Sequence, residues 1–278
     1  MPIPSQRKYI ISERGADAIQ LTIETFLRRL SKSSITPASI LSQPFTRMHS
    51  WDDCYLFFQA NLPGYIASPS GNKGFLDEAT LHLAFYLASF GMFRGTLPYL
   101  QYSKDIFRQP LLETFDLMRS EKWVLPSVLS NPKALFRLQT RFKESLTASL
   151  HTAGYIETSQ PSSLLLQKVF LGIFAASPAL DRFCAKGLKN LKEIENAPKE
   201  IKELSNPFAS EESLRNWYLF AENLAANELF KALKPSSISD RAYPIMRKID
   251  LILWSIGKSR VESDKRKKKK TKEMDNTI

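Results

Sequence analysis

Glycine, cysteine and histidine are scarce in this sequence, and each shortage excludes a class of structure. The 278 residues include only 10 Gly, against 16 Pro and 18 Phe, which disfavours turn-rich β architectures and glycine-rich phosphate-binding loops. The two cysteines, Cys54 and Cys184, are far apart and form no CxxC pair, so neither a secreted disulfide scaffold nor a structural zinc site is expected. We expect both thiols to be buried and reduced.

The standard catalytic and nucleotide-binding motifs are also missing. The sequence has no GxxxxGK[ST], no GxGxxG after a strand, no HExxH and no GxSxG. Its three histidines, His49, His82 and His151, do not have the spacing of metal ligands. We therefore expect no metal site and no cofactor.

No apolar run is long enough to suggest a membrane span. The longest, from Ala79 to Phe93, is interrupted by His82 and is shorter than the roughly 20 residues that cross a bilayer. The first residues lack the apolar core of a signal peptide. These features predict a cytoplasmic protein without a transmembrane segment.

The sequence is rich in helical patterns. Apolar residues recur at helix spacing along nearly the whole chain, and many of these stretches begin at a capping residue such as Ser50, Asn131 or Ser210. We find no alternating strand pattern and no fixed-period repeat. The sequence predicts an all-α protein with about nine or ten helices in one compact domain over residues 1–257, with 190–209 as the candidate internal boundary.

Three local patterns give more specific predictions. A helix opened by Asp77 and ending near Phe93 is apolar on nearly every side, so we expect it at the centre of the fold. Pro63–Gly64 and Ser68–Gly74 predict a loop. Gly257 is expected to end the last helix.

The end of the chain is strongly basic. Residues 258–278 contain nine Lys or Arg and four Asp or Glu, so they carry +5 of the formal net charge of +11. Because such a block repels itself, we predict a disordered tail over 258–278. It can solubilise the chain or contact the phosphates of DNA, RNA or anionic lipid, and the candidate nucleic-acid contact residues are Lys265, Arg266, Lys267, Lys268, Lys269, Lys270 and Lys272.

Two of the polar candidates belong to the apolar 79–93 segment and its end. His82 shares a helical stripe with Ala79 and Tyr86, which fits either a core histidine or a catalytic base. Arg94 lies between Gly91 and Gly95, where a cation can cap a helix end, pair with a buried acid or bind an anion.

Three further candidates lie in the second half of the chain. Asp181 and Arg182 border an apolar helical stripe. Asp250 falls on the apolar face of the last helix, where an unpaired carboxylate is costly. Arg247, three residues earlier, can reach it, and Arg94 can reach it through the fold. An internal polar network is the preferred interpretation, with a catalytic cleft as the alternative.

Three strings stand out: Phe85–Gly95 (FYLASFGMFRG), Pro178–Phe183 (PALDRF) and Tyr243–Trp254 (YPIMRKIDLILW). Together they resemble strings that recur in a family of bacterial all-helical proteins without an assigned activity. The resemblance implies a bacterial source and one continuous domain, and it implies no reaction.

The leading functional hypothesis is a non-catalytic helical binding protein. It would associate with nucleic acid or a protein partner, with the basic tail adding attraction to phosphates. The alternative is an enzyme acting on nucleic acid or nucleotides, with Arg94, Asp181, Arg182 and Asp250 lining a pocket. Convergence of these side chains on an open cleft favours the enzyme, and mutual burial in pairs favours the binding protein.

Overall fold

The fold is entirely helical in the part of the chain that can be described. The structure is a computed structural model, and it describes residues 13–31, 48–71, 74–93, 104–154, 160–232 and 243–275. Within these ranges there are nine α-helices of 11 residues or more, three of four or five residues, and no strand. The predicted all-α fold class is confirmed. None of the described helices contains an 18-residue window apolar enough for a bilayer crossing.

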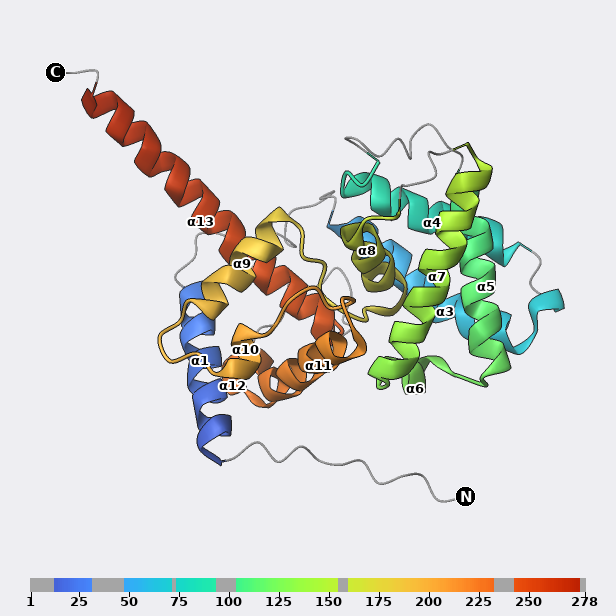
Figure 1. Cartoon of the computed structure of the whole chain (residues 1–278), viewed down its shortest axis with the longest axis horizontal. Helices are drawn as coiled ribbons and strands as arrows, with labels where there is room; N and C mark the ends of the chain where they lie inside the picture. Colours follow the sequence, from blue (N-terminus) through green and yellow to red (C-terminus); the bar gives the residue numbers. More distant parts are fainter. Residues whose placement is uncertain are drawn as a thin grey trace.

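Two hydrophobic cores organise these helices, and each occupies one half of the molecule (Figure 1). The first core is built mainly by the consecutive elements α3 (His49–Ala67), η1 (Pro69–Gly71), α4 (Phe75–Ser89), η3 (Lys104–Phe107), α5 (Arg108–Ser120), α6 (Leu125–Leu129), α7 (Pro132–Thr152) and α8 (Ser163–Phe174). At its centre, α8 is buried at every position from Leu165 to Phe174.

The second core combines the start and the end of the chain. Its helices are α1 (Glu13–Ser31), α9 (Arg182–Lys192), α10 (Lys199–Lys202), α11 (Glu211–Ala226), α12 (Glu228–Ala232) and α13 (Ile245–Asp275). The chain passes from the first core to the second between Ala179 and Cys184. The 190–209 segment contributes Ile194, Ile201 and Leu204 to the second core.

Capping residues explain where several helices begin. The Asn131 side chain accepts a hydrogen bond from the Ala134 N–H (3.1 Å), and Ser210 accepts one from the Ser213 N–H (3.1 Å), so these two predicted caps are confirmed. The predicted cap at Ser50 is wrong, because α3 already begins at His49 and its N-cap residue is Met48. The α9 helix begins after Asp181, whose carboxylate accepts hydrogen bonds from two N–H groups of the first turn. The preceding Ala175 is left-handed (φ 47°) and ends α8.

The predicted loop at Pro63–Gly64 is wrong, because α3 continues through both residues to Ala67. Proline inside a helix costs about 3 kcal/mol through its missing N–H and its ring clash. The buried face of α3 includes Leu62 and Tyr65 on either side of Pro63, and their burial offsets this cost.

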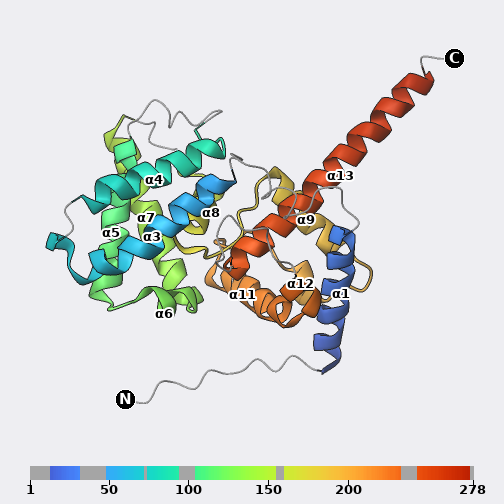
Figure 2. The same ribbon diagram turned by 180° about the vertical axis from the view of Figure 1, so that it is seen from behind.

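The predicted central position of the 79–93 helix is also wrong. The helix α4 lies beside α3 on one face of the molecule, with no other helix in front of the pair (Figure 2). Its Leu81 and Phe85 are 56% and 59% exposed. The neighbours of α4 are α3, η3, α5 and α8, and they leave part of its apolar surface facing outward.

Gly257 does not end the last helix, which continues to Asp275, so the predicted disordered tail is wrong for residues 258–275, which are helical. A Cβ at Gly257 would lie 1.9 Å from the Phe183 carbonyl oxygen, and one at Gly187 would lie 2.0 Å from the Leu253 carbonyl oxygen. Both glycines therefore allow α9 and α13 to touch backbone to backbone. Beyond this contact α13 extends away from the body of the molecule (Figures 1 and 2).

Candidate functional site

A set of charged side chains, three of them buried and one half-buried, lies where the two cores meet, and we call it the inter-core network: Lys168, Asp181, Arg247 and Asp250. Arg247 Nη1 lies 2.8 Å from Asp250 Oδ2, and both side chains are buried. The predicted pairing of these two residues is confirmed. The Arg247 guanidinium also stacks 4.6 Å from the Trp51 ring centroid and donates to the Met48 carbonyl (3.5 Å). Arg247 thus connects α13 to the first turn of α3.

The second oxygen of Asp250 is also occupied. Asp250 Oδ1 accepts a hydrogen bond from the Ala179 N–H (2.9 Å) and lies 3.6 Å from Cys184 Sγ. Ala179 belongs to the connection between α8 and α9. Both oxygens of this carboxylate are therefore engaged by protein groups, and they hold the crossing between the cores in place.

Lys168 on α8 pairs with Asp181, the N-cap of α9. The Nζ–Oδ2 distance is 3.2 Å, and Lys168 Nζ also lies 4.7 Å from the Phe90 ring centroid. Burial favours the neutral amine, but the carboxylates of Asp250 and Asp181 outweigh it and hold the pKa of Lys168 above its usual value. Burial raises the pKa of Asp181, but Lys168 and two backbone N–H donors outweigh it and lower that pKa overall. Both groups stay charged at neutral pH.

The cysteine thiol beside the network is a poor candidate nucleophile. Burial raises the pKa of the Cys184 thiol well above its usual value, and the neighbouring carboxylates of Asp250 and Asp181 raise it further. Cys184 is thus a neutral thiol and a poor nucleophile. Burial likewise raises the pKa of Cys54, and both cysteines are free and buried, as predicted. The side-chain oxygen of Gln167 accepts a hydrogen bond from the Leu180 N–H (2.7 Å).

The structure brings together only part of the predicted site. Asp181 and Asp250 belong to the inter-core network, whereas Arg182 is exposed and lies over the Phe183 ring, 5.9 Å from its centroid. His82 lies apart from them on α4, stacked on Phe57 with a centroid distance of 4.2 Å. Arg94 lies outside the described residues.

Lys168 is the network residue that the sequence analysis missed. It is the single charged residue of α8, inside an otherwise apolar stretch. A lone lysine in an apolar helix could have predicted a buried ion pair, since a buried lysine requires a partner.

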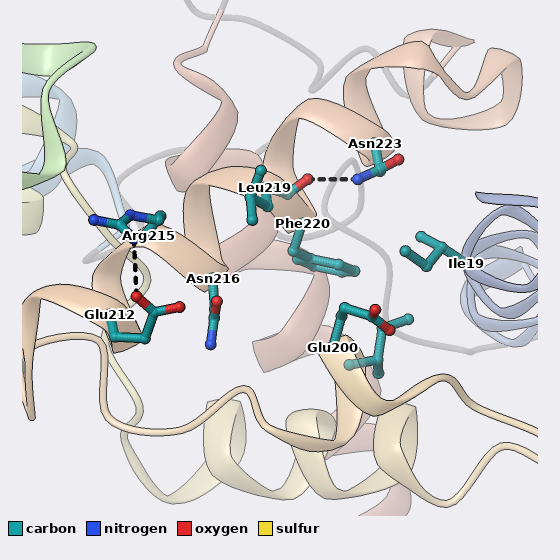
Figure 3. A pocket seen from close by; sticks show the side chains of 9 residues that line it. Ile19, Glu200, Glu212, Arg215, Asn216, Leu219, Phe220 and Asn223 are labelled. Atoms are coloured by element: carbon teal, nitrogen blue, oxygen red, sulfur yellow. Dashed lines mark hydrogen bonds and ion pairs between the residues drawn. The ribbon is translucent and has the colours of Figure 1, made fainter. Parts of the chain in front are cut away.

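Two hollows lie away from the network. One, of about 170 Å³, lies between α1, α10 and α11 and has Ile19, Ile201 and Phe220 in its wall (Figure 3). Three of its polar side chains are already engaged: Arg215 pairs with Glu212 (3.0 Å), and Asn223 donates a hydrogen bond to the Leu219 carbonyl of its own helix (2.7 Å). The other is an open hollow of about 710 Å³ between α3 and α4. No group of three or more His, Cys, Asp or Glu within the described ranges is placed to hold a metal ion.

The basic end of α13 has two parts. Up to Asp264 it is docked on α9, through Arg260–Glu193 (3.1 Å) and Lys186–Asp264 (3.3 Å). Lys265 and Arg266 follow, and both are exposed, with no acid of the described chain within 4 Å. The side chains of the other predicted phosphate contacts, Lys267–Lys270 and Lys272, lie outside the described residues.

Comparisons with known proteins give no guide to the role of the inter-core network or of the basic end of α13. No family model, curated protein or solved structure matches the chain. The resemblance to bacterial all-helical proteins stays a prediction.

Proposed function

We propose that this protein is a non-catalytic helical binding protein that associates with nucleic acid through the basic end of α13. The observation that carries the proposal is that α13 continues past its contact with α9 and projects from the body (Figure 1). Beyond Asp264 the chain has seven basic and two acidic residues. A positive rod that leaves the globular body is accessible to a polyanion.

The spacing of these charges suits a phosphate backbone. The six consecutive basic residues 265–270 concentrate six positive charges in one short stretch of the chain. Each neutralised phosphate releases counterions, which makes the attraction long-range, salt-sensitive and independent of base sequence.

The inter-core network supports the binding role over the enzyme alternative. Arg247 and Asp250 are buried in a pair, and Asp181 is occupied by Lys168 and by the first turn of α9. Groups that already neutralise one another have little capacity to bind or protonate a substrate. Their positions suit a structural role in joining the cores.

The test compares the full chain with a chain that ends at Asp264. The shortened chain keeps the ion pairs to α9 but loses a net charge of +5. Binding to a labelled DNA duplex and to a labelled RNA is measured by fluorescence anisotropy over a salt series. We expect the full chain to bind with a log–log salt slope as steep as about −6, and the shortened chain to lose most of this dependence.

Two variants of the full chain serve as matched controls. Replacing the seven basic residues after Asp264 with Gln should reproduce the truncation, whereas replacing the six lysines among them with Arg should preserve binding, since phosphate attraction depends on charge. Equal binding by the full and shortened chains would contradict the proposal. So would sedimentation with phosphatidylserine vesicles without any binding to nucleic acid.

A further inference from the structure

Large apolar side chains are exposed to solvent on the surface between α3 and α4. Four large hydrophobic side chains in the described ranges are exposed, and two of them, Leu81 and Phe85, lie one helical turn apart on α4. Both border the open hollow of about 710 Å³ between the two helices. Scattered single apolar residues are ordinary on a surface, but adjacent ones that border a hollow mark an interaction site.

The hollow has the form of a helix-binding groove, and we call it the α3–α4 groove. Its α3 side is formed by Asp53, Leu56, Phe57 and Ala60, and its α4 side by Leu81, His82 and Phe85. The α3 positions follow i, i+3, i+4 and i+7 spacing, which is the pattern of a helix face that packs on another helix. In Figure 2 no described helix lies in front of the α3–α4 pair.

The groove has a definite length. Asp53 and Ala60 are seven residues apart on α3, which corresponds to about 10.5 Å or two helical turns. An occupant of matching length presents bulky apolar side chains at i, i+3 or i+4, and i+7. Phe57 and His82 stack on one another (4.2 Å) and give the groove a rigid aromatic floor.

The charge of Asp53 favours an occupant that carries the opposite charge near it. Asp53 is exposed, and no described cation lies within ion-pair distance of it, although it lines an otherwise apolar surface. A carboxylate in that position favours a Lys or Arg on the occupant and disfavours an acid.

We propose that the α3–α4 groove docks an amphipathic helix of a protein partner, with a two-turn apolar stripe and a Lys or Arg placed to meet Asp53. A second copy of this chain is a poorer occupant, because two chains of net charge +11 repel one another at long range. The inference does not rest on nucleic-acid binding, since the groove belongs to the first core and the basic segment to α13.

The test selects ligands from a display library of helix-forming peptides with randomised surface positions, using the full chain as bait. We expect the enriched peptides to carry the two-turn apolar stripe and a basic residue. Their affinities are then measured by fluorescence anisotropy for the unaltered chain and for Leu81→Ser and Phe85→Ser. Each substitution should weaken binding by about tenfold or more, because such anchors dominate helix-in-groove affinity. Both side chains are exposed, so the variants should fold normally.

Control variants distinguish binding at this groove from non-specific binding to exposed apolar residues elsewhere. Leu21→Ser and Val124→Ser remove apolar side chains that are 65% and 59% exposed elsewhere, and they should change affinity by less than about twofold. Asp53→Lys should lower the affinity for the enriched peptides that carry a basic residue by about two- to fivefold. The chain that ends at Asp264 should bind the same peptides equally well, whether or not it has lost nucleic-acid binding.

Three results would overturn the proposal. One is enrichment of peptides without the apolar stripe, and another is equal binding of the enriched peptides to Phe85→Ser. The third is a concentration-dependent dimer of the unaltered chain that Phe85→Ser abolishes, since that result assigns the groove to a second copy.

Discussion

Arg247 and Asp250 are ionisable residues whose side chains are buried away from water. A buried ion pair is tolerated only when both partners have good geometry and further hydrogen bonds. Asp250 meets this condition with a cation and the Ala179 N–H. Arg247 meets it in part, with a carboxylate, a carbonyl and the Trp51 ring, while its buried Nε has no hydrogen-bond partner among the described residues. Their spacing of three residues made the pair predictable, because one helical turn brings them together.

Removing one partner of this pair should be strongly destabilising. Arg247→Met leaves the Asp250 carboxylate buried without its cation, and we expect a loss of about 3–5 kcal/mol in the free energy of unfolding, measured in urea. Adding Asp250→Asn should restore part of the loss, since Asn is neutral and still accepts from Ala179. Arg215→Met, in the half-exposed pairs with Glu211 and Glu212, should cost no more than about 1 kcal/mol. A loss for Arg247→Met as small as for Arg215→Met would contradict the structural role of the network.

The Lys168–Asp181 pair should make stability depend on pH in a defined direction. The pKa of Asp181 is lowered from 3.8, so its stabilisation is present above pH 3.8 and is lost as the pH falls through the folded-state value. The pKa of Lys168 is raised from 10.5, so its stabilisation is present below pH 10.5 and is lost as the pH rises through its folded-state value.

We therefore expect the stability difference between the unaltered chain and Lys168→Met to be constant from about pH 5 to pH 9 and to shrink on acidification below about pH 4. The measurement is urea unfolding across this range. Lys189→Met removes one of the two cations that pair with the exposed Glu193, and it should show only a small difference. A Lys168→Met difference that grows on acidification would be inconsistent with the pair.

At the scale of elements, the contact between α9 and α13 shows why a glycine is ambiguous in a sequence. Gly257 follows an apolar helical stretch, as a helix-ending glycine does, and nothing local indicates that another backbone lies against it. The same ambiguity affects α4 and α8. Both are apolar on most sides, but their sequences do not specify how many neighbours cover them.

Substitutions of the contact glycines test this element pair. Gly187→Ala and Gly257→Ala each place a Cβ within 2.0 Å of a carbonyl oxygen, so the helices must separate, at a cost of about 1–3 kcal/mol or more. Gly64→Ala is the matched control, because it lies inside α3 with no atom within 4 Å of the new Cβ. It should be neutral or stabilising by up to about 1 kcal/mol. The thermal unfolding midpoint distinguishes these cases, and a rise for Gly257→Ala would refute the contact.

At the scale of the whole molecule, α1 completes a core whose other helices come from the C-terminal half of the chain. Its Ile23 is buried among residues of the second core, whereas Leu21 on the same helix is exposed. The first core is built mainly from consecutive elements between α3 and α8. A change in α1 should therefore act on one half of the molecule more than on the other.

Ile23→Ala should destabilise the protein by about 2–5 kcal/mol, because it leaves a cavity. Hydrogen exchange followed by mass spectrometry should show a larger increase in α9, α11 and α13 than in α3–α8. Leu21→Ala should change neither stability nor exchange appreciably, since its side chain is solvated. A uniform increase over both halves would indicate that the two cores open together.

The all-helical class, the caps at Asn131 and Ser210 and the Arg247–Asp250 pair followed from the order of residues alone. Each depends on neighbours within one or two helical turns, and helix geometry fixes such distances. The partners of Lys168, the role of Gly257 and the outward face of α4 required the folded chain. They depend on which helices meet, and that choice is made by packing among segments far apart in the sequence, where local spacing carries no information.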